Sequence, residues 1–394
     1  MKKITAIILL LIISITAVAC QKKDKSAPNT EPPVSLDEIG EIYETDPNRA
    51  AWTMLESMTL DEKIYQLMIV APEALGDGSI ITGVTDAVKS GISNHPVGGV
   101  VLFGDNIQSR ENTEKLIADL QETSPIPLFV AVDEEGGMVT RLSGVEGMGV
   151  SEVPSMQTLG EEGDSQKVFE TGKTLGTEIG AIGFNVNFAP VADILVNGEN
   201  TEIGSRSFGT DPAVVSEMVG NMVKGLRESG IASAVKHFPG HGSALTDSHS
   251  GRARSQRTYE EMQTADLLPF KAGIEAGADF VMISHMVNSD ITKTDMECSM
   301  STNVMTNILR NTMGFPNIII TDSLSMKAIT DFYSPGAAAL TAFEAGADML
   351  LMPENIEEAH SAIKAAVKSG RVSELRLNES VSRILKVKLE RGII

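Results

Sequence analysis

Short apolar runs recur along the chain, and segments with helical periodicity separate them. Each run is continuously hydrophobic rather than alternating, which is typical of parallel strands that are covered on both faces. The segments 211–229 and 259–276 carry apolar residues at helical spacing. Seven strands are predicted from this pattern, over residues 100–103, 128–132, 184–191, 232–238, 280–283, 318–321 and 349–352.

The sequence EAGAD occurs at 275–279 and again at 344–348, each time directly before a predicted strand. A glycine at this place is a typical helix end, so both copies mark a helix-to-strand junction. The segment 58–71 is ambiguous, but an eighth strand is expected within 67–71. Seven or eight β-α units favour an α/β chain folded as a single-domain (β/α)8 TIM-type barrel over an open doubly wound sheet.

Polar residues gather at the ends of these predicted strands. A barrel enzyme carries its catalytic groups at the carboxyl ends of the strands, so this concentration on one face predicts an active site. Solvation of loop starts alone would not predict such a concentration. The residues in question are Asp133, Glu134, Glu135, Asp193, Lys236, His237, His285 and Asp322.

The N-terminus has the pattern of an export signal. Lys2 and Lys3 precede the apolar stretch 4–15, and the small residues of 16–19 lead to Cys20. A spanning helix would need about 20 apolar residues, which this stretch does not reach. A cysteine after Ala-Val-Ala is typical of bacterial lipoproteins, so we expect a signal peptide over 1–19 and lipidation of Cys20. An ordinary cleaved signal is the alternative.

The polar, proline-bearing segment 20–47 predicts a flexible tether, and the barrel domain is expected over 48–394. These features predict an exported protein that is lipid-anchored at the extracytoplasmic face of a bacterial cell membrane. The formal net charge of −21 gives no electrostatic case for nucleic-acid binding. With Cys20 lipidated, Cys298 has no disulfide partner, and we interpret it as an unreactive buried residue.

The segment KHFPGHGSALTDSH at 236–249 is the strongest chemical signal. His237 and His241 have the spacing of a helical zinc pair, but Pro239 and Gly240 lie between them and would break a helix. A loop that leaves a strand is therefore predicted, with no metal site. Further along, Asp247 stands two residues before His249, where its carboxylate can orient the imidazole for general acid-base work.

Asp322 follows the predicted strand 318–321 and so lies at the mouth of the expected barrel. A carboxylate at this place can act as a nucleophile, bind a metal ion or cap a helix. The sequence pattern alone leaves these three roles open.

Five motifs together resemble glycoside hydrolase family 3, in its β-N-acetylhexosaminidase branch. They are VDEEGG at 132–137, NFAPVADI at 187–194, IGSRSFGTDP at 203–212, KHFPGHG at 236–242 followed by DSH at 247–249, and ITDSLSM at 320–326. The resemblance covers the chain from about residue 58 to residue 394. The chain departs from the usual family pattern at Met138, at Ser323 and over 250–254, next to residues that bind sugar in the family.

The resemblance implies a retaining exo-glycosidase. It makes Asp322 the nucleophile and His249 the general acid/base, with Asp247 orienting the imidazole. Residues that match Asp133, Arg141, Arg206, Lys236 and His237 bind the terminal sugar in the family.

The expected reaction is hydrolysis of terminal, non-reducing β-linked N-acetylhexosamine from peptidoglycan- or chitin-type fragments. No metal or organic cofactor is expected, and the chain is expected to act as a monomer. Three alternatives stay open. They are a β-N-acetylglucosaminide phosphorylase, a β-glucosidase of the same family, and a glycan-binding lipoprotein without catalysis.

Overall fold

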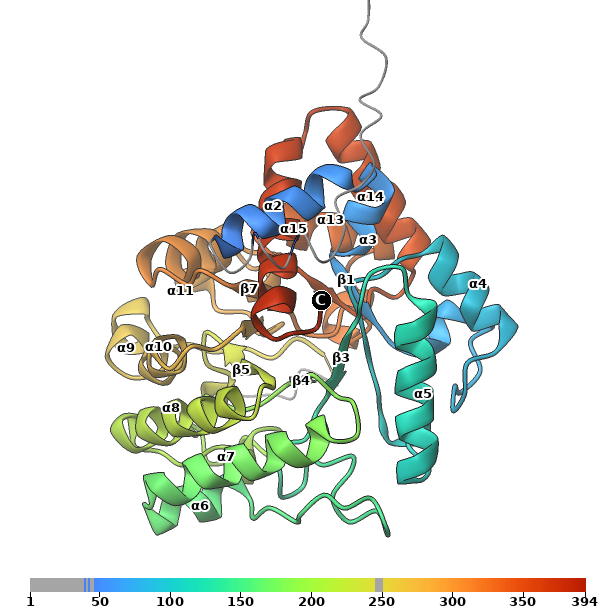
Figure 1. Ribbon diagram of the computed structural model, residues 1–394. Coiled ribbons are helices and arrows are strands. Elements are labelled where there is room, and N and C mark those ends of the chain that lie inside the picture. The colour runs from blue at the N-terminus through green and yellow to red at the C-terminus, as the bar shows by residue number, and fades with distance from the viewer. Residues whose placement is uncertain (1–38, 40–41, 43–45, 245–250) are drawn as a thin grey trace, which may run out of the picture. The chain divides into compact units, whose positions relative to one another are not determined.

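Eight parallel strands form one barrel in the computed structural model, which describes residues 39, 42, 46–244 and 251–394 (Figure 1). Neighbours pair in the order β7-β6-β5-β4-β3-β2-β1-β8. A parallel bridge between Ile320 and Met349 joins β7 to the start of β8 and closes the barrel. The strands are β1 (Met68–Val70), β2 (Gly99–Val101), β3 (Phe129–Val132), β4 (Val186–Asn187), β5 (Ala232–Phe238), β6 (Phe280–Ile283), β7 (Ile318–Thr321) and β8 (Leu350–Leu351).

Helices connect successive strands and lie around the sheet (Figure 1). Those before β5 are α2 (Pro47–Ser57), α3 (Leu60–Tyr65), α4 (Asp86–Asn94), α5 (Arg110–Thr123), α6 (Met156–Glu162), α7 (Ser165–Gly180) and α8 (Pro212–Glu228). Those after β5 are α9 (Tyr259–Thr264), α10 (Leu267–Glu275), α11 (Ser289–Thr292), the π-helix η6 (Asn303–Thr312), α12 (Lys327–Thr330), α13 (Pro335–Ala345), α14 (Ile356–Lys368) and α15 (Glu374–Glu390). The predicted (β/α)8 barrel is confirmed, and the expected eighth strand is β1.

Two predicted elements differ in detail from the structure. The strand predicted over 184–191 narrows to β4, and beyond it Pro190 has no N–H to give to a ladder, so only a single bridge joins Val191 to Lys236. The helix predicted over 259–276 is broken into α9 and α10. At the break the buried Asp266 carboxylate accepts hydrogen bonds from the Arg257 guanidinium at 2.7 and 3.1 Å.

The EAGAD junctions each end a helix with a glycine in the left-handed or an adjacent positive-φ conformation, at 93° for Gly277 and 128° for Gly346. The aspartate that follows is fully buried in both copies. Asp279 accepts the Ser233 N–H at 3.1 Å, and Asp348 accepts the Ile319 N–H at 2.9 Å. Each repeat thus ties the start of its own strand to the strand before it.

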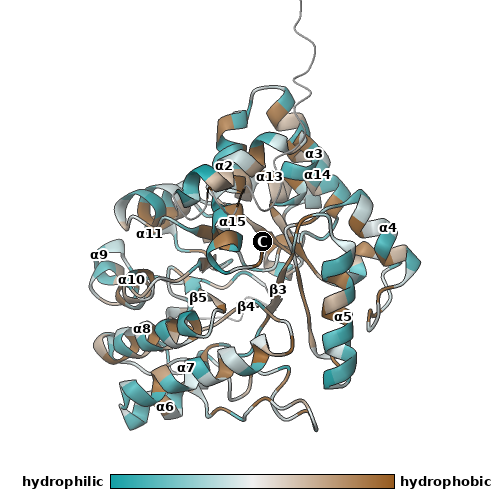
Figure 2. Cartoon of the chain, viewed as in Figure 1, coloured by the Kyte–Doolittle hydropathy of each residue, from teal (hydrophilic) through white to brown (hydrophobic). Residues whose placement is uncertain are grey.

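The hydrophobic residues face the interfaces between strands and helices. All eight strands are buried along their length, whereas helices such as α5 and α7 carry hydrophilic residues beside hydrophobic ones (Figure 2). Lys388 of α15 is an exception to this pattern, since it is a charged residue that is fully buried. Its ammonium donates to the Gln66 side chain at 2.8 Å and lies 5.1 Å from the centre of the Phe129 ring. Within the described part of the chain, no helix is long and apolar enough to cross a membrane.

Candidate active site

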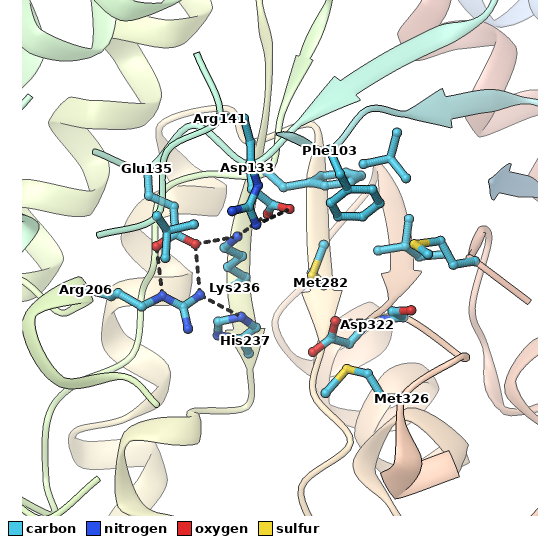
Figure 3. Close-up of a pocket in the computed structure, with 16 residues that line it drawn as sticks. Phe103, Asp133, Glu135, Arg141, Arg206, Lys236, His237, Met282, Asp322 and Met326 are labelled. Atoms are coloured by element: carbon cyan, nitrogen blue, oxygen red, sulfur yellow. Dashed lines mark hydrogen bonds and ion pairs between the residues drawn. The ribbon is translucent and has the colours of Figure 1, made fainter. Parts of the chain in front are cut away.

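A cavity of about 350 Å³ lies at the carboxyl ends of the strands. One of its walls is polar and the other is mainly apolar (Figure 3). The polar wall consists of Asp133, Glu135, Arg141, Arg206, Lys236 and His237. Phe103, Met282, Asp322 and Met326 lie on the opposite side (Figure 3), and the lining also includes Val101, Ser323, Leu351 and Met352.

Ion pairs connect the side chains of the polar wall. The Lys236 ammonium lies 2.7 Å from an Asp133 oxygen and 2.6 Å from a Glu135 oxygen. The Arg206 guanidinium donates to both oxygens of Glu135, at 2.9 Å each. Glu135 therefore holds two cations, from β5 and from the loop after β4, in fixed positions beside the cavity (Figure 3).

These contacts keep the groups charged despite their burial. Burial alone would raise the pKa of Glu135, but Lys236 and Arg206 outweigh it and lower that pKa to about 2. Burial likewise acts to lower the pKa of Lys236, and the carboxylates of Asp133 and Glu135 raise it above its ordinary value. The wall consequently offers fixed donors and acceptors that suit a ring of hydroxyl groups.

The three acidic residues after β3 point in alternating directions. Asp133 and Glu135 line the cavity, whereas Glu134 is buried and accepts the backbone N–H groups of Arg141 and Leu142 at 2.7 and 2.8 Å. This carboxylate fixes the loop that carries Arg141. The Arg141 guanidinium then lies 4.0 Å from the second oxygen of Asp133.

His237 reaches the cavity from the end of β5 and is held from behind by Asp193. The fully buried Asp193 carboxylate contacts Nδ1 of His237 at 2.7 Å and accepts its backbone N–H at 3.1 Å. Its other oxygen accepts the backbone N–H of His241 at 2.6 Å. His241 starts a short 3₁₀ turn rather than sharing a helix with His237, so the two do not form the zinc pair of a helix.

Asp322 follows β7 and faces the same cavity. Its backbone N–H donates to the Ile283 carbonyl at 2.9 Å, which fixes it to β6, and one carboxylate oxygen accepts the Ser323 N–H at 2.7 Å. The helix-capping alternative is excluded, because the next helix, α12, begins at Lys327 with Met326 as its N-cap.

The environment of Asp322 favours the carboxylate form. Burial acts to raise its pKa, but His285, His237, the Ser323 N–H and Lys236 together lower the pKa below its ordinary value. A buried carboxylate that stays ionised beside an open cavity can attack an electron-poor carbon.

His285 lies behind Asp322, where burial lowers the pKa of the imidazole. The His285 Nε2–H donates to the Ser323 carbonyl at 2.9 Å, so this residue supports the loop that starts at Asp322.

The apolar wall beside Asp322 contains three methionines, Met282, Met326 and Met352. Met352 follows β8 with φ at 47°, a conformation that residues other than glycine seldom adopt. Thioether side chains are flexible and polarisable, so this wall can adapt to the shape of a ligand.

Asp247, His249 and Cys20 lie outside the described residues. In the described part of the chain after residue 250, Arg252 contacts the buried Glu297 carboxylate at 2.5 Å, and the Tyr333 hydroxyl donates to the same carboxylate at 3.0 Å. Residues 46–244 and 251–394 contain no group of three or more His, Cys, Asp or Glu residues that could hold a metal ion.

The structure brings together all six of the described residues that the sequence analysis assigned to the site. They are Asp133, Arg141, Arg206, Lys236, His237 and Asp322, and all line one cavity. Glu135 and Asp193 were among the strand-end residues that predicted an active site, but the family resemblance assigned neither of them a role. Residues two apart in an extended segment point to the same side, so the place of Glu135 two residues after Asp133 indicated that both face the cavity.

Comparison with known proteins places this barrel in a family. The model of the glycosyl hydrolase family 3 N terminal domain matches residues 59–387. Beta-hexosaminidase A from Pseudoalteromonas piscicida is 33% identical over 326 residues, which are 75% of this chain and 54% of that protein. A beta-hexosaminidase from Xylella fastidiosa (strain 9a5c) is 36% identical over 280 residues, 69% of this chain and 81% of that one.

A solved structure is also similar, that of a glycoside hydrolase family 3 beta-N-acetylglucosaminidase from Paenibacillus sp. str. FPU-7. The TM-score is 0.80 at 36% identity, and the match covers 86% of this chain but 63% of that chain. This chain thus spans little more than half of the Pseudoalteromonas protein and under two thirds of the Paenibacillus structure. The matches confirm the resemblance carried by the five motifs, and the chain belongs to glycosyl hydrolase family 3.

Proposed function

We propose that the chain is an exo-acting β-N-acetylhexosaminidase that releases terminal, non-reducing β-linked N-acetylhexosamine. The observation that carries this proposal is the ionised Asp322 opposite a wall of fixed donors and acceptors in one cavity. The cavity volume of about 350 Å³ is near the lower end of the range for ligand sites, which suits one sugar ring. The beta-hexosaminidase relatives support N-acetylhexosamine as that sugar.

The proposed mechanism is retaining and has two steps. Asp322 attacks the anomeric carbon while His249, oriented by Asp247, protonates the leaving oxygen, and a glycosyl ester forms on Asp322. His249 then removes a proton from water, which attacks the anomeric carbon and releases the sugar with its original configuration. Asp133, Arg141, Arg206, Lys236 and His237 hold the ring hydroxyls during both steps.

The physiological setting is part of the same proposal. A signal peptide over 1–19 and lipidation of Cys20 would place the enzyme outside the cytoplasm, on a tether that covers 20–47. Peptidoglycan or chitin fragments are glycans with β-linked N-acetylhexosamine at this location. The domain over 48–394 would act there as a monomer.

The experiment is hydrolysis of 4-nitrophenyl β-N-acetylglucosaminide by the full chain, with the β-glucoside as the competing substrate. We expect the N-acetylated substrate to be preferred and the β-anomer to appear first in the NMR spectrum of the product. Asp322→Asn should lower kcat by roughly a thousandfold or more. Asp331→Asn is the matched control, because Asp331 is exposed at the end of α12, between β7 and α13, and contacts Lys327 only at 3.3 Å.

A second variant tests the acid/base. His249→Ala should lose most activity on a substrate with a poor leaving group and much less on an activated dinitrophenyl glycoside, which needs no protonation. Equal losses on both substrates would contradict the assigned role. Glycosyl phosphate as the main product in phosphate buffer would instead identify a phosphorylase, and sugar binding without turnover would identify a glycan-binding protein.

A further inference from the structure

His237 lies between two neighbours that assign opposite roles to its two ring nitrogens. Nδ1 is 2.7 Å from a carboxylate oxygen of Asp193, and a carboxylate that is ionised can only accept. Nε2 is 3.4 Å from Nη2 of Arg206, and a guanidinium can only donate. The arrangement is therefore consistent with one tautomer, in which Nδ1 carries the proton and Nε2 carries a lone pair.

Asp193 is placed to enforce this tautomer. The residue is fully buried, and its carboxylate accepts three N–H groups, namely the ring and backbone N–H of His237 and the backbone N–H of His241. It thus fixes both the ring and the main chain at the end of β5. Asp193 is not among the residues that line the cavity, whereas His237 is, so Asp193 acts through His237.

The other members of the polar wall already supply both kinds of partner. Lys236, Arg141 and Arg206 are donors only. Both oxygens of Glu135 accept from Arg206 and one also contacts Lys236, whereas Asp133 contacts Lys236 at 2.7 Å through one oxygen and lies 4.0 Å from Arg141 with the other. A sugar hydroxyl that enters such a wall can accept from the cations. An unprotonated Nε2 adds an acceptor that is only loosely engaged by Arg206.

We propose that Asp193 is a positioning residue which holds His237 as a hydrogen-bond acceptor, so that Nε2 selects a sugar hydroxyl that donates its proton. The ligand class is a pyranose with a free hydroxyl at the position that faces Nε2. This inference rests on the proposed function for the identity of the sugar, but the assignment of the tautomer does not depend on it.

The first experiment needs no variant. NMR of the full chain with ¹⁵N-labelled histidine, at pH 8, should show His237 protonated at Nδ1 alone. Addition of N-acetylglucosamine should move the Nε2 resonance and leave Nδ1 little changed. Protonation at Nε2, or at both nitrogens, would overturn the proposal. The Nδ1–H tautomer with no response of Nε2 to a bound sugar would overturn the role of Nε2 in selecting a hydroxyl. The absence of any response to the sugar among the residues of the polar wall would contradict the proposed function instead.

The second experiment measures the selectivity. Deoxy and deoxyfluoro substrates carry hydrogen or fluorine in place of the hydroxyl that faces Nε2. Both should lose roughly 10- to 100-fold in kcat/KM, because neither substituent can donate a hydrogen bond to Nε2. Asp193→Asn should lose a similar factor with the hydroxyl substrate, chiefly through KM, and should no longer distinguish it from these analogues. Glu199→Gln, an exposed change in the same loop, is the control.

A double variant separates positioning from general damage to the fold. Asp193→Asn combined with His237→Ala should be no less active than His237→Ala alone, since both changes remove one interaction. Fully additive losses would show that Asp193 acts independently of His237 and would overturn the proposal. The proposal would also be overturned if each ring hydroxyl could be replaced by fluorine, one position at a time, without any loss in turnover.

Discussion

Single residues of the polar wall are coupled through charge, and Glu135 is the centre of this coupling. It contacts Lys236 at 2.6 Å and Arg206 at 2.9 Å while almost fully buried. The sequence places Asp133, Glu134 and Glu135 together at a strand end but does not say which of them faces the cavity. In the structure, backbone N–H groups of the loop at 140–143 donate to the Glu134 carboxylate, so Asp133 and Glu135 are the two that line the cavity.

Glu135→Gln should weaken substrate binding and lower the stability of the fold at neutral pH. The lowered pKa of about 2, against an ordinary 4.5, means that Glu135 stabilises the fold above about pH 4.5 and loses this contribution as the pH falls toward 2. The variant should lose about 3 to 5 kcal/mol at neutral pH, and its unfolding free energy should fall less steeply between pH 4.5 and 2. Urea titrations at several pH values measure this.

The matched control for this prediction is Glu146→Gln, because Glu146 is exposed on the loop after β3. It should leave KM and the pH dependence of unfolding as they are in the natural chain. An unchanged KM in Glu135→Gln would contradict a role of this carboxylate in holding Lys236 and Arg206.

At the scale of elements, the sequence predicted the strands well and their irregularities poorly. Continuous apolar runs are sufficient to locate buried parallel strands, as β6 and β7 show by agreeing with the prediction at both ends. The short β4 depends on Pro190, which has no N–H for the ladder, and the break between α9 and α10 coincides with the buried ion pair of Asp266 with Arg257. Hydrophobic periodicity continues through Asp266, so the sequence pattern predicts one unbroken helix. The break goes with the burial of the Asp266 carboxylate against Arg257, which the pattern does not reveal.

The EAGAD repeat gives a prediction for the elements that it joins. Asp348 is fully buried, accepts the Ile319 N–H, and is surrounded by Arg310, Arg376 and Arg383. Asp348→Asn should destabilise the barrel by about 3 to 5 kcal/mol, because three cations would lose their buried counter-charge.

Equilibrium unfolding in urea measures the effect of Asp348→Asn. Asp119→Asn serves as the control, since Asp119 makes an exposed ion pair with Lys115 within α5 and should matter little. A loss no larger than that of the control would refute the role assigned to Asp348.

At the scale of the whole molecule, the first and last parts of the described chain meet at Lys388. Its ammonium connects α15 to Gln66, just before β1, and faces the ring of Phe129 in β3. The group has no carboxylate partner in these contacts, and burial lowers its pKa from 10.5 to about 7. The unfolded chain therefore binds more protons than the folded one between these pH values.

Because of this difference, Lys388 should make the natural chain more stable as the pH rises from about 7 to 10.5. The slope from one proton is about 1.4 kcal/mol per pH unit. Lys388→Met should lack this slope and be more stable at neutral pH. Thermal or urea unfolding across this range tests it, with Lys386→Met, which is next to Glu390, as control. Parallel pH profiles for Lys388→Met and the natural chain would contradict the prediction.

The two walls of the cavity differ in how much change they can tolerate. Asp133, Glu135, Arg206 and Lys236 of the polar wall share one network of ion pairs, so substitution of any one of them removes a partner from another buried or half-buried charge. Met282, Met326 and Met352, in contrast, can exchange for other apolar residues at modest cost. Divergence among relatives, and laboratory selection for new sugars, should therefore accumulate on the methionine side. The polar wall would remain a fixed anchor while substrate preference evolves opposite it.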